Sequence, residues 1–166
     1  PHEVAGMAGY SKNIVVGLGG AENIHKTHFL GAAYGIERIM GRSGTPVRRV
    51  FDRVLESYLA DLPIIHAITV VGQDERGGLV TRGLYIGNDR ECFEKASALS
   101  RAVNIHLLEK RPRTMVAFMD PREYKSMWLA NKAIYRSRMA IADGGRLIVL
   151  APGVKTFGED TEIDRL

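Results

Sequence analysis

Short apolar runs typical of β-strands alternate along this chain with longer amphipathic stretches typical of α-helices. The expected strands cover residues 14–16, 64–71, 79–86, 105–108, 114–119 and 147–150. The expected helices cover residues 21–39, 46–59, 89–103 and 122–139. Because alternating strands and helices pack as layers, this order predicts an α/β fold. A turn signal over residues 73–78 adds a β-hairpin.

A charged stretch that contains Pro112, residues 109–113, interrupts this pattern and predicts a domain boundary. We expect residues 1–110 and residues 111–166 to belong to two domains that face a cleft. The chain starts at Pro1 without an initiator Met, and residues 158–166 resemble a helix start with no helix to follow. We therefore expect a segment of a longer protein that lacks its N-terminal part.

Composition excludes several classes of protein. The chain is 45% hydrophobic and 25% charged, which is typical of a globular protein and not of a disordered or fibrous one. The single cysteine, Cys92, excludes an internal disulfide framework. No apolar run reaches the roughly 18 residues that a membrane span requires, and no secretory signal follows the start. We expect a cytoplasmic protein that does not bind membranes.

The net charge of +4 leaves a basic nucleic-acid adaptor open as one function. The arginines that suggest it are Arg48, Arg49, Arg111, Arg113, Arg136 and Arg138. They are dispersed among acidic residues, and no aromatic platform for bases accompanies them. A solvated surface is the alternative, and we expect no nucleic-acid partner.

Gly17, Gly19 and Gly20 lie between an expected strand and an expected helix. Free backbone N–H groups at such a position can hold a phosphate, and the other interpretation is a tight turn. This leaves a non-catalytic phosphate- or nucleotide-binding module as a second alternative function.

Histidines and one lysine are the remaining candidates for chemistry. His25 and His28 share one face of the expected helix, either as metal ligands or as one surface and one packed residue. His66 and His106 lie in apolar strands and are expected in the core. Lys12 follows a glycine-containing loop and precedes an apolar run, so it is either a desolvated nucleophile or an ordinary loop lysine.

These signals form one ordered motif, which consists of His2, Gly6, Gly9, Lys12, Gly17 and His28. This order resembles the nickel-pincer lactate racemase family. Lys12 follows His2 by 10 residues, and His28 follows Lys12 by 16, as in the family. Tyr10 stands where the family has a glycine.

The resemblance implies a role for each matching residue. Lys12 would carry the nickel-pincer pyridinium mononucleotide through a thioamide bond, and His28 would ligate the nickel. His2 would be a catalytic acid/base group. The cofactor loop would be lined by Gly6, Ala8 and Gly9. His25 matches no family role.

The family's second domain has an aromatic residue followed four positions later by a lysine, and here Trp128 and Lys132 have this relation. The resemblance implies that Trp128 lines the substrate pocket and that Lys132 binds the substrate carboxylate. Leu129 replaces a glutamine of the lactate racemase itself, which favours a 2-hydroxy acid other than lactate.

Taken together, the resemblance implies a racemase or epimerase of a small 2-hydroxy acid. It would act by proton-coupled hydride transfer and would depend on cofactor biosynthesis proteins as partners. A second acid/base histidine would lie outside this chain, so we expect the segment alone to be inactive.

Overall fold

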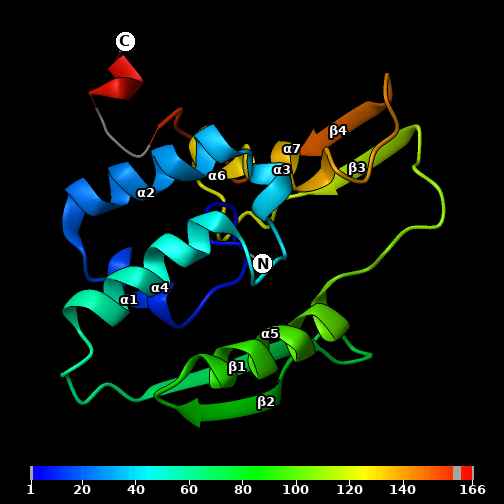
Figure 1. The fold of residues 1–166 in the computed structure, drawn as a ribbon. Coiled ribbons are helices and arrows are strands. Elements are labelled where there is room, and N and C mark those ends of the chain that lie inside the picture. Colours follow the sequence, from blue (N-terminus) through cyan, green and yellow to red (C-terminus); the bar gives the residue numbers. More distant parts are fainter. Residues whose placement is uncertain (1, 159–161, 166) are drawn as a thin grey trace. The chain divides into compact units, whose positions relative to one another are not determined.

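The computed structural model describes residues 2–158 and 162–165, and its helices and strands alternate as the α/β prediction requires (Figure 1). The chain divides into two compact units, with the division between His106 and Leu107. The sequence placed its boundary a few residues later, in the charged stretch 109–113. No helix in the described part of the chain is long and apolar enough to cross a membrane.

Helices form the first part of the first unit. They are α1 (Ser11–Val15), α2 (Gly20–Tyr34), α3 (Ile36–Ile39) and α4 (Pro46–Tyr58). The strand expected at residues 14–16 is wrong, because these residues end α1 and its C-cap. A run of three apolar residues does not distinguish a strand from a buried helical turn. The single helix expected over residues 21–39 is interrupted at Gly35, whose φ of 108° is left-handed.

Helix α4 begins as the sequence predicts. The Thr45 side chain accepts a hydrogen bond from the Arg48 N–H at 3.1 Å, and Pro46 occupies the first helical position. Helix α4 packs on α1 and α2, and its apolar face contributes to the core of this unit. The buried members of that core are Ala5, Val15, Val16, Ile39, Val47 and Phe51.

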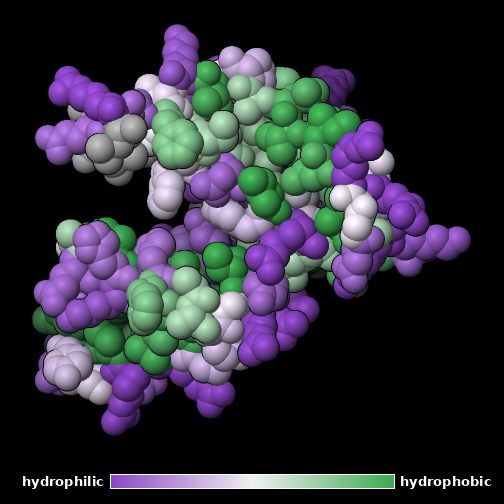
Figure 2. Space-filling view, turned by 90° about the horizontal axis from the view of Figure 1, so that it is seen from above, coloured by the Kyte–Doolittle hydropathy of each residue, from purple (hydrophilic) through white to green (hydrophobic). Residues whose placement is uncertain are grey.

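An antiparallel hairpin and one helix complete the first unit, as predicted. Strands β1 (His66–Gln73) and β2 (Leu79–Gly87) pair, and α5 (Arg90–Asn104) covers one face of the pair (Figure 1). Asp89 caps α5 by accepting from the Cys92 N–H at 3.1 Å. Large apolar side chains stay exposed on β2, and hydrophobic patches are visible on the molecular surface in Figure 2.

The second unit contains two parallel strands, β3 (Thr114–Phe118) and β4 (Arg146–Leu150). The helix expected over residues 122–139 is wrong in extent, because only α6 (Met127–Ala130) and α7 (Lys132–Ser137) form there. The strand expected at residues 105–108 does not form. Near the end, Ile163–Arg165 forms one 3-10 turn, and the rest of the expected helix start, residues 159–161 and 166, lies outside the described residues.

The cap of α4 generates a stability prediction. Replacing Thr45 with Ala removes the acceptor for the Arg48 N–H in a buried setting. We expect Thr45→Ala to lower the free energy of unfolding by about 1 kcal/mol in urea denaturation. Thr45→Ser retains the hydroxyl and is expected to lose clearly less. Equal losses in the two variants would contradict the capping role.

Candidate functional site

The loop that carries the glycines folds back on itself at its start. The His2 N–H donates to the Gly6 carbonyl at 2.7 Å, and the Gly6 N–H donates to the His2 carbonyl at 2.9 Å. The Val4 N–H donates to His2 Nδ1 at 3.3 Å. This closed turn fixes the backbone of His2 relative to Gly6.

Gly6 is required by close backbone packing. Its φ is +76°, and a Cβ there would lie 1.9 Å from the Arg42 carbonyl oxygen. The Gly41 N–H donates to the Gly6 carbonyl at 3.0 Å, which attaches the turn to the end of α3. Gly6 and Gly9 are buried, and Gly6 packs against the backbone that follows α3. Ala8, between them, is exposed.

Arg48, from α4, is completely buried beneath this loop. Its Nη1 donates to the Gly9 carbonyl at 3.1 Å and to Ser11 Oγ at 3.0 Å. Its Nη2 donates to the Ala5 carbonyl at 3.1 Å and to the Met7 carbonyl. Burial lowers the pKa of Arg48 to about 10, and the Asp52 carboxylate opposes this lowering. The guanidinium therefore remains charged at neutral pH.

A chain of polar contacts extends from this cation. Ser11 Oγ donates to Asp52 Oδ1 at 2.5 Å, and Asp52 Oδ2 accepts from Arg90 Nη1. Arg90 also pairs with Glu94 at 2.9 Å. The loop, α4 and α5 are thus joined through alternating positive and negative groups.

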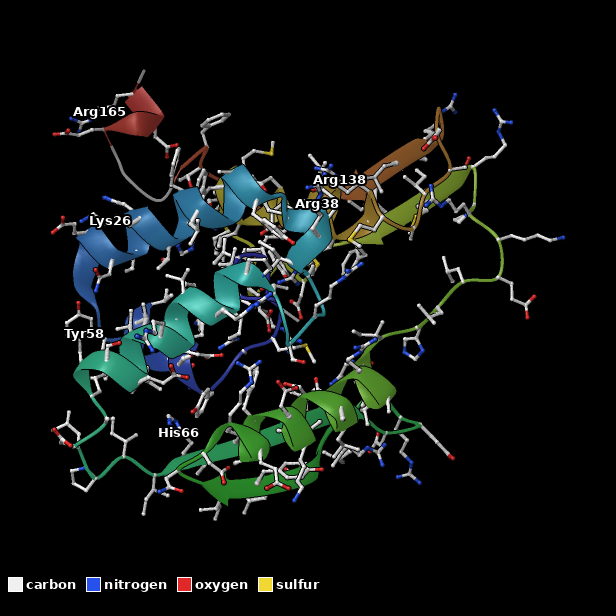
Figure 3. All side chains as sticks on the ribbon, viewed as in Figure 1. Lys26, Arg38, Tyr58, His66, Arg138 and Arg165 are labelled. Carbon is white, nitrogen blue, oxygen red and sulfur yellow. The ribbon has the colours of Figure 1, made fainter. Side chains whose placement is uncertain are left out.

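Tyr10 has an unusual backbone at the end of the loop. Among the described residues it is the only non-glycine residue with positive φ, at 55°. Its ring stacks on Phe93 with a centroid separation of 5.7 Å and lies 4.6 Å from the His66 ring. His66 begins β1 and is labelled in Figure 3. These ring contacts support a conformation that costs free energy for any side chain larger than glycine.

His2, Lys12 and His28 interact electrostatically. Burial lowers the pKa of His2 to about 4, and positive charges on Lys12 and His28 contribute to the lowering, while Glu3 opposes it. All three motif side chains are half-buried. Residues 26 positions apart in sequence, His2 and His28, therefore belong to one electrostatic environment.

The hydrogen bonding of His28 leaves one ring nitrogen available. His28 Nδ1 lies 2.7 Å from the Ile24 carbonyl oxygen, which can only accept, so Nδ1 carries the proton. Nε2 then has a free lone pair, the form in which histidine binds metals. His25 is exposed on the same helix. The described residues contain no group of three or more His, Cys, Asp or Glu side chains placed to hold a metal ion.

A cavity of about 260 Å³ lies beside the loop. Its wall includes Ala8 and Gly9 from the loop, Asn13 from α1, and Ser97 from α5. Ser97 Oγ is buried and has no hydrogen-bond partner in the described structure. Gly17 and Gly19 lie elsewhere, in the link between α1 and α2, and Gly20 begins α2, so these glycines follow a helix and not the expected strand.

The candidate substrate residues lie in the second unit. Trp128 belongs to α6 and is 65% exposed, whereas Lys132 begins α7 and is half-buried. Asn131 separates the two helices, and its side chain donates to the Trp128 carbonyl at 2.9 Å. The two residues therefore stand on successive short helices and not on one continuous helix. Leu129 is half-buried in α6.

Two expectations about charged and polar residues are corrected. Arg48 is buried and not part of a solvated face, although Arg49, Arg111 and Arg136 are exposed. His106 is exposed and lies outside any strand, whereas His66 is buried as expected.

Sequence reasoning missed four residues of the site, namely Ser11, Arg48, Asp52 and Arg90. A signal for two of them was present, because Arg48 and Asp52 are four residues apart and adjoin Val47 and Phe51 on the apolar face of α4. An ionic pair on a buried helix face indicates a polar partner from another segment.

The fold and the site together define an α/β protein in which His2 and Lys12 lie at the two ends of a loop that packs over the buried Arg48. A solved protein from Thermotoga maritima has this fold, with a TM-score of 0.75 over 99% of this chain. The two sequences are 23% identical, so the likeness shows the fold alone, and the match covers 40% of the Thermotoga protein. No family model and no curated protein matches the sequence.

The environment of His2 generates a pH prediction. Its pKa of about 4 in the folded chain lies below the usual value of 6.5, so between these values the unfolded chain binds the extra proton. The His2 contribution to stability is therefore lost as the pH falls from 6.5 to 4, by up to about 3 kcal/mol. Urea denaturation of the wild type and His2→Gln across this range measures the difference. Parallel pH curves for the two proteins would contradict the shift.

Proposed function

We propose that this chain carries the cofactor-bearing motif of a nickel-dependent racemase or epimerase of a small 2-hydroxy acid. The observation that supports it is the common electrostatic environment of His2, Lys12 and His28, which are spaced in sequence as in the nickel-pincer lactate racemase family.

The donor chemistry of the three residues fits the proposed cofactor. Lys12 offers a primary amine from a half-buried position in the first turn of α1, where it can form one amide-type bond. His28 offers a free Nε2, because its Nδ1 is bonded to the Ile24 carbonyl. One imidazole together with soft sulfur donors from the cofactor is a donor set that suits square-planar nickel.

When bound, the lysine-tethered pyridinium cofactor would supply a carbon that accepts and returns the C2 hydride of the substrate. The remaining chemistry belongs to this chain. His2 has a pKa of about 4, so its ring is neutral at pH 7. Its Nδ1 accepts from the Val4 N–H at 3.3 Å, so Nδ1 would take the hydroxyl proton of the substrate in place of this long hydrogen bond. Returning that proton from the same nitrogen would regenerate the starting enantiomer. The inverted product would need the second acid/base group that the resemblance implies outside this chain.

The second unit is proposed to bind the substrate. A lysine side chain such as that of Lys132 pairs with a carboxylate, and Trp128 offers an exposed aromatic surface against which a small substrate can pack. Leu129 cannot donate or accept a side-chain hydrogen bond. The proposed substrate is therefore a 2-hydroxy acid other than lactate. It would present an apolar group to Leu129, where a glutamine would make a hydrogen bond.

The attachment of the cofactor can be tested at Lys12. We expect the full-length protein that contains this chain, produced with the cofactor biosynthesis proteins, to carry extra mass on the peptide with Lys12. Lys12→Ala should abolish that mass completely. Lys26→Ala is the matched control, because Lys26 lies on an exposed helix face, where it pairs with Glu22 at 2.6 Å. Peptide mapping by mass spectrometry measures both, and an unmodified Lys12 in a fully active racemase would refute the proposal.

The nickel ligand is tested separately. His28→Ala removes the proposed ligand nitrogen, so nickel content should fall to near zero while the mass on Lys12 remains. His25→Ala removes an exposed histidine three residues earlier and should leave nickel content unchanged. Metal analysis of the purified proteins gives the result. Equal nickel loss in both variants would indicate a paired-histidine site and contradict the assignment.

A further inference from the structure

We infer that Arg48 is the positioning residue of this site, which holds His2 and Lys12 in place through the loop between them. The inference rests on the proposed function for its catalytic consequence. It rests on the hydrogen bonds of the guanidinium for its structural basis. Nothing in the motif itself points to this residue, because it lies 36 positions after Lys12 on another helix.

The contacts of Arg48 follow the loop at every second residue. It bonds to the carbonyls of Ala5, Met7 and Gly9 and to the hydroxyl of Ser11. These four acceptors converge on one planar group, so the path of the loop is determined by the geometry of the guanidinium. A loop that turned away at any of these residues would leave a buried charge without its partner.

The ends of this segment adjoin the two reactive residues. On one side, Ala5 precedes Gly6, whose backbone makes two hydrogen bonds with the backbone of His2. On the other side, Ser11 is the first residue of α1 and directly precedes Lys12. A displacement of the loop therefore changes the separation between the imidazole of His2 and the amine of Lys12.

The guanidinium also contacts Phe93 from α5 and Ser11 from α1. Its central carbon lies 4.5 Å from the ring centroid of Phe93 on α5. Ser11 Oγ accepts a hydrogen bond from Arg48 and donates one to the Asp52 carboxylate. Asp52 also accepts a hydrogen bond from Arg90. Because both helices contribute to this enclosure, Arg48 transmits the rigidity of the α4 and α5 framework to the loop.

Lysine cannot substitute in this role. An ammonium group has three donors on a single atom and no planar fork, so it cannot replace the contacts that Nη1 and Nη2 make from two separate atoms. Arg48→Lys therefore keeps the charge and most of the volume but loses the simultaneous contacts. Arg48→Met keeps volume alone.

The structural part is tested by amide hydrogen exchange on this chain, without any cofactor. The probes are the amides of Gly6 and Asn13, which donate to the His2 and Tyr10 carbonyls, and the reference amides are those of the β1–β2 ladder. In Arg48→Lys we expect exchange at Gly6 and Asn13 to rise at least about tenfold, since several buried hydrogen bonds are lost. The ladder amides should stay within about twofold of the wild type.

The matched control is Arg49→Met, which changes an exposed arginine on the same turn of α4. It should leave both groups of amides unchanged. An equal rise at the loop and the ladder in Arg48→Lys would identify Arg48 as a general core residue and overturn the inference. Loop exchange equal to that of Arg49→Met would overturn it as well.

The functional part uses the full-length protein with its cofactor. Arg48→Lys should lower kcat at least about tenfold while KM changes less than about twofold, because the misplaced groups act in the reaction and not in substrate binding. An unchanged kcat would overturn the positioning role. If the wild type carries no adduct on Lys12, the proposed function fails, whereas the exchange result still decides whether Arg48 holds the loop.

Discussion

A charged guanidinium without solvent contact is the feature on which the first unit depends. Removing an isolated cation from water is costly, and the cost is offset only where hydrogen bonds and an opposite charge replace the lost solvation. Arg48 meets this condition with three carbonyls, one hydroxyl and the nearby Asp52. The loop that provides the carbonyls has little regular structure of its own. The arginine and the loop are therefore stable only together.

This mutual dependence explains why the loop can be both irregular and ordered. Loops usually expose their carbonyls to water, because buried carbonyls need partners. Here one side chain supplies the partners, and the exposed side of the loop at Ala8 stays open beside a cavity. The polar chain through Asp52 and Arg90 then ties this arrangement to the hairpin and its helix. A rigid framework beneath an accessible loop is the arrangement that positioned chemistry requires.

Helices and strands with strong local signals were predictable from the sequence, whereas the buried Arg48 that holds the loop was not. The cap at Thr45, the cap at Asp89 and the hairpin turn each depend on neighbouring residues, and all three form where the sequence places the helix starts and the hairpin. The run 14–16 failed because its local pattern fits two structures, and the helix over 122–139 failed because its periodicity does not reveal the break at Asn131. Burial of Arg48 depends on carbonyls of a loop 39 to 43 residues away, and no local pattern encodes such contacts. The motif spacing led to His2, Lys12 and His28. Arg48, which holds the loop from α4, lies outside that motif and could not be found from its spacing.

Tyr10 shows how one backbone angle makes a loop residue depend on side chains that are distant in sequence. A residue with φ of 55° is tolerated most easily as glycine, and the tyrosine here is accompanied by the rings of Phe93 and His66. Those two rings come from α5 and β1, far from the loop in sequence. Without both rings, the strained backbone of Tyr10 would have no compensating packing. The conformation at the end of the loop therefore depends on side chains that two other elements of the same unit provide.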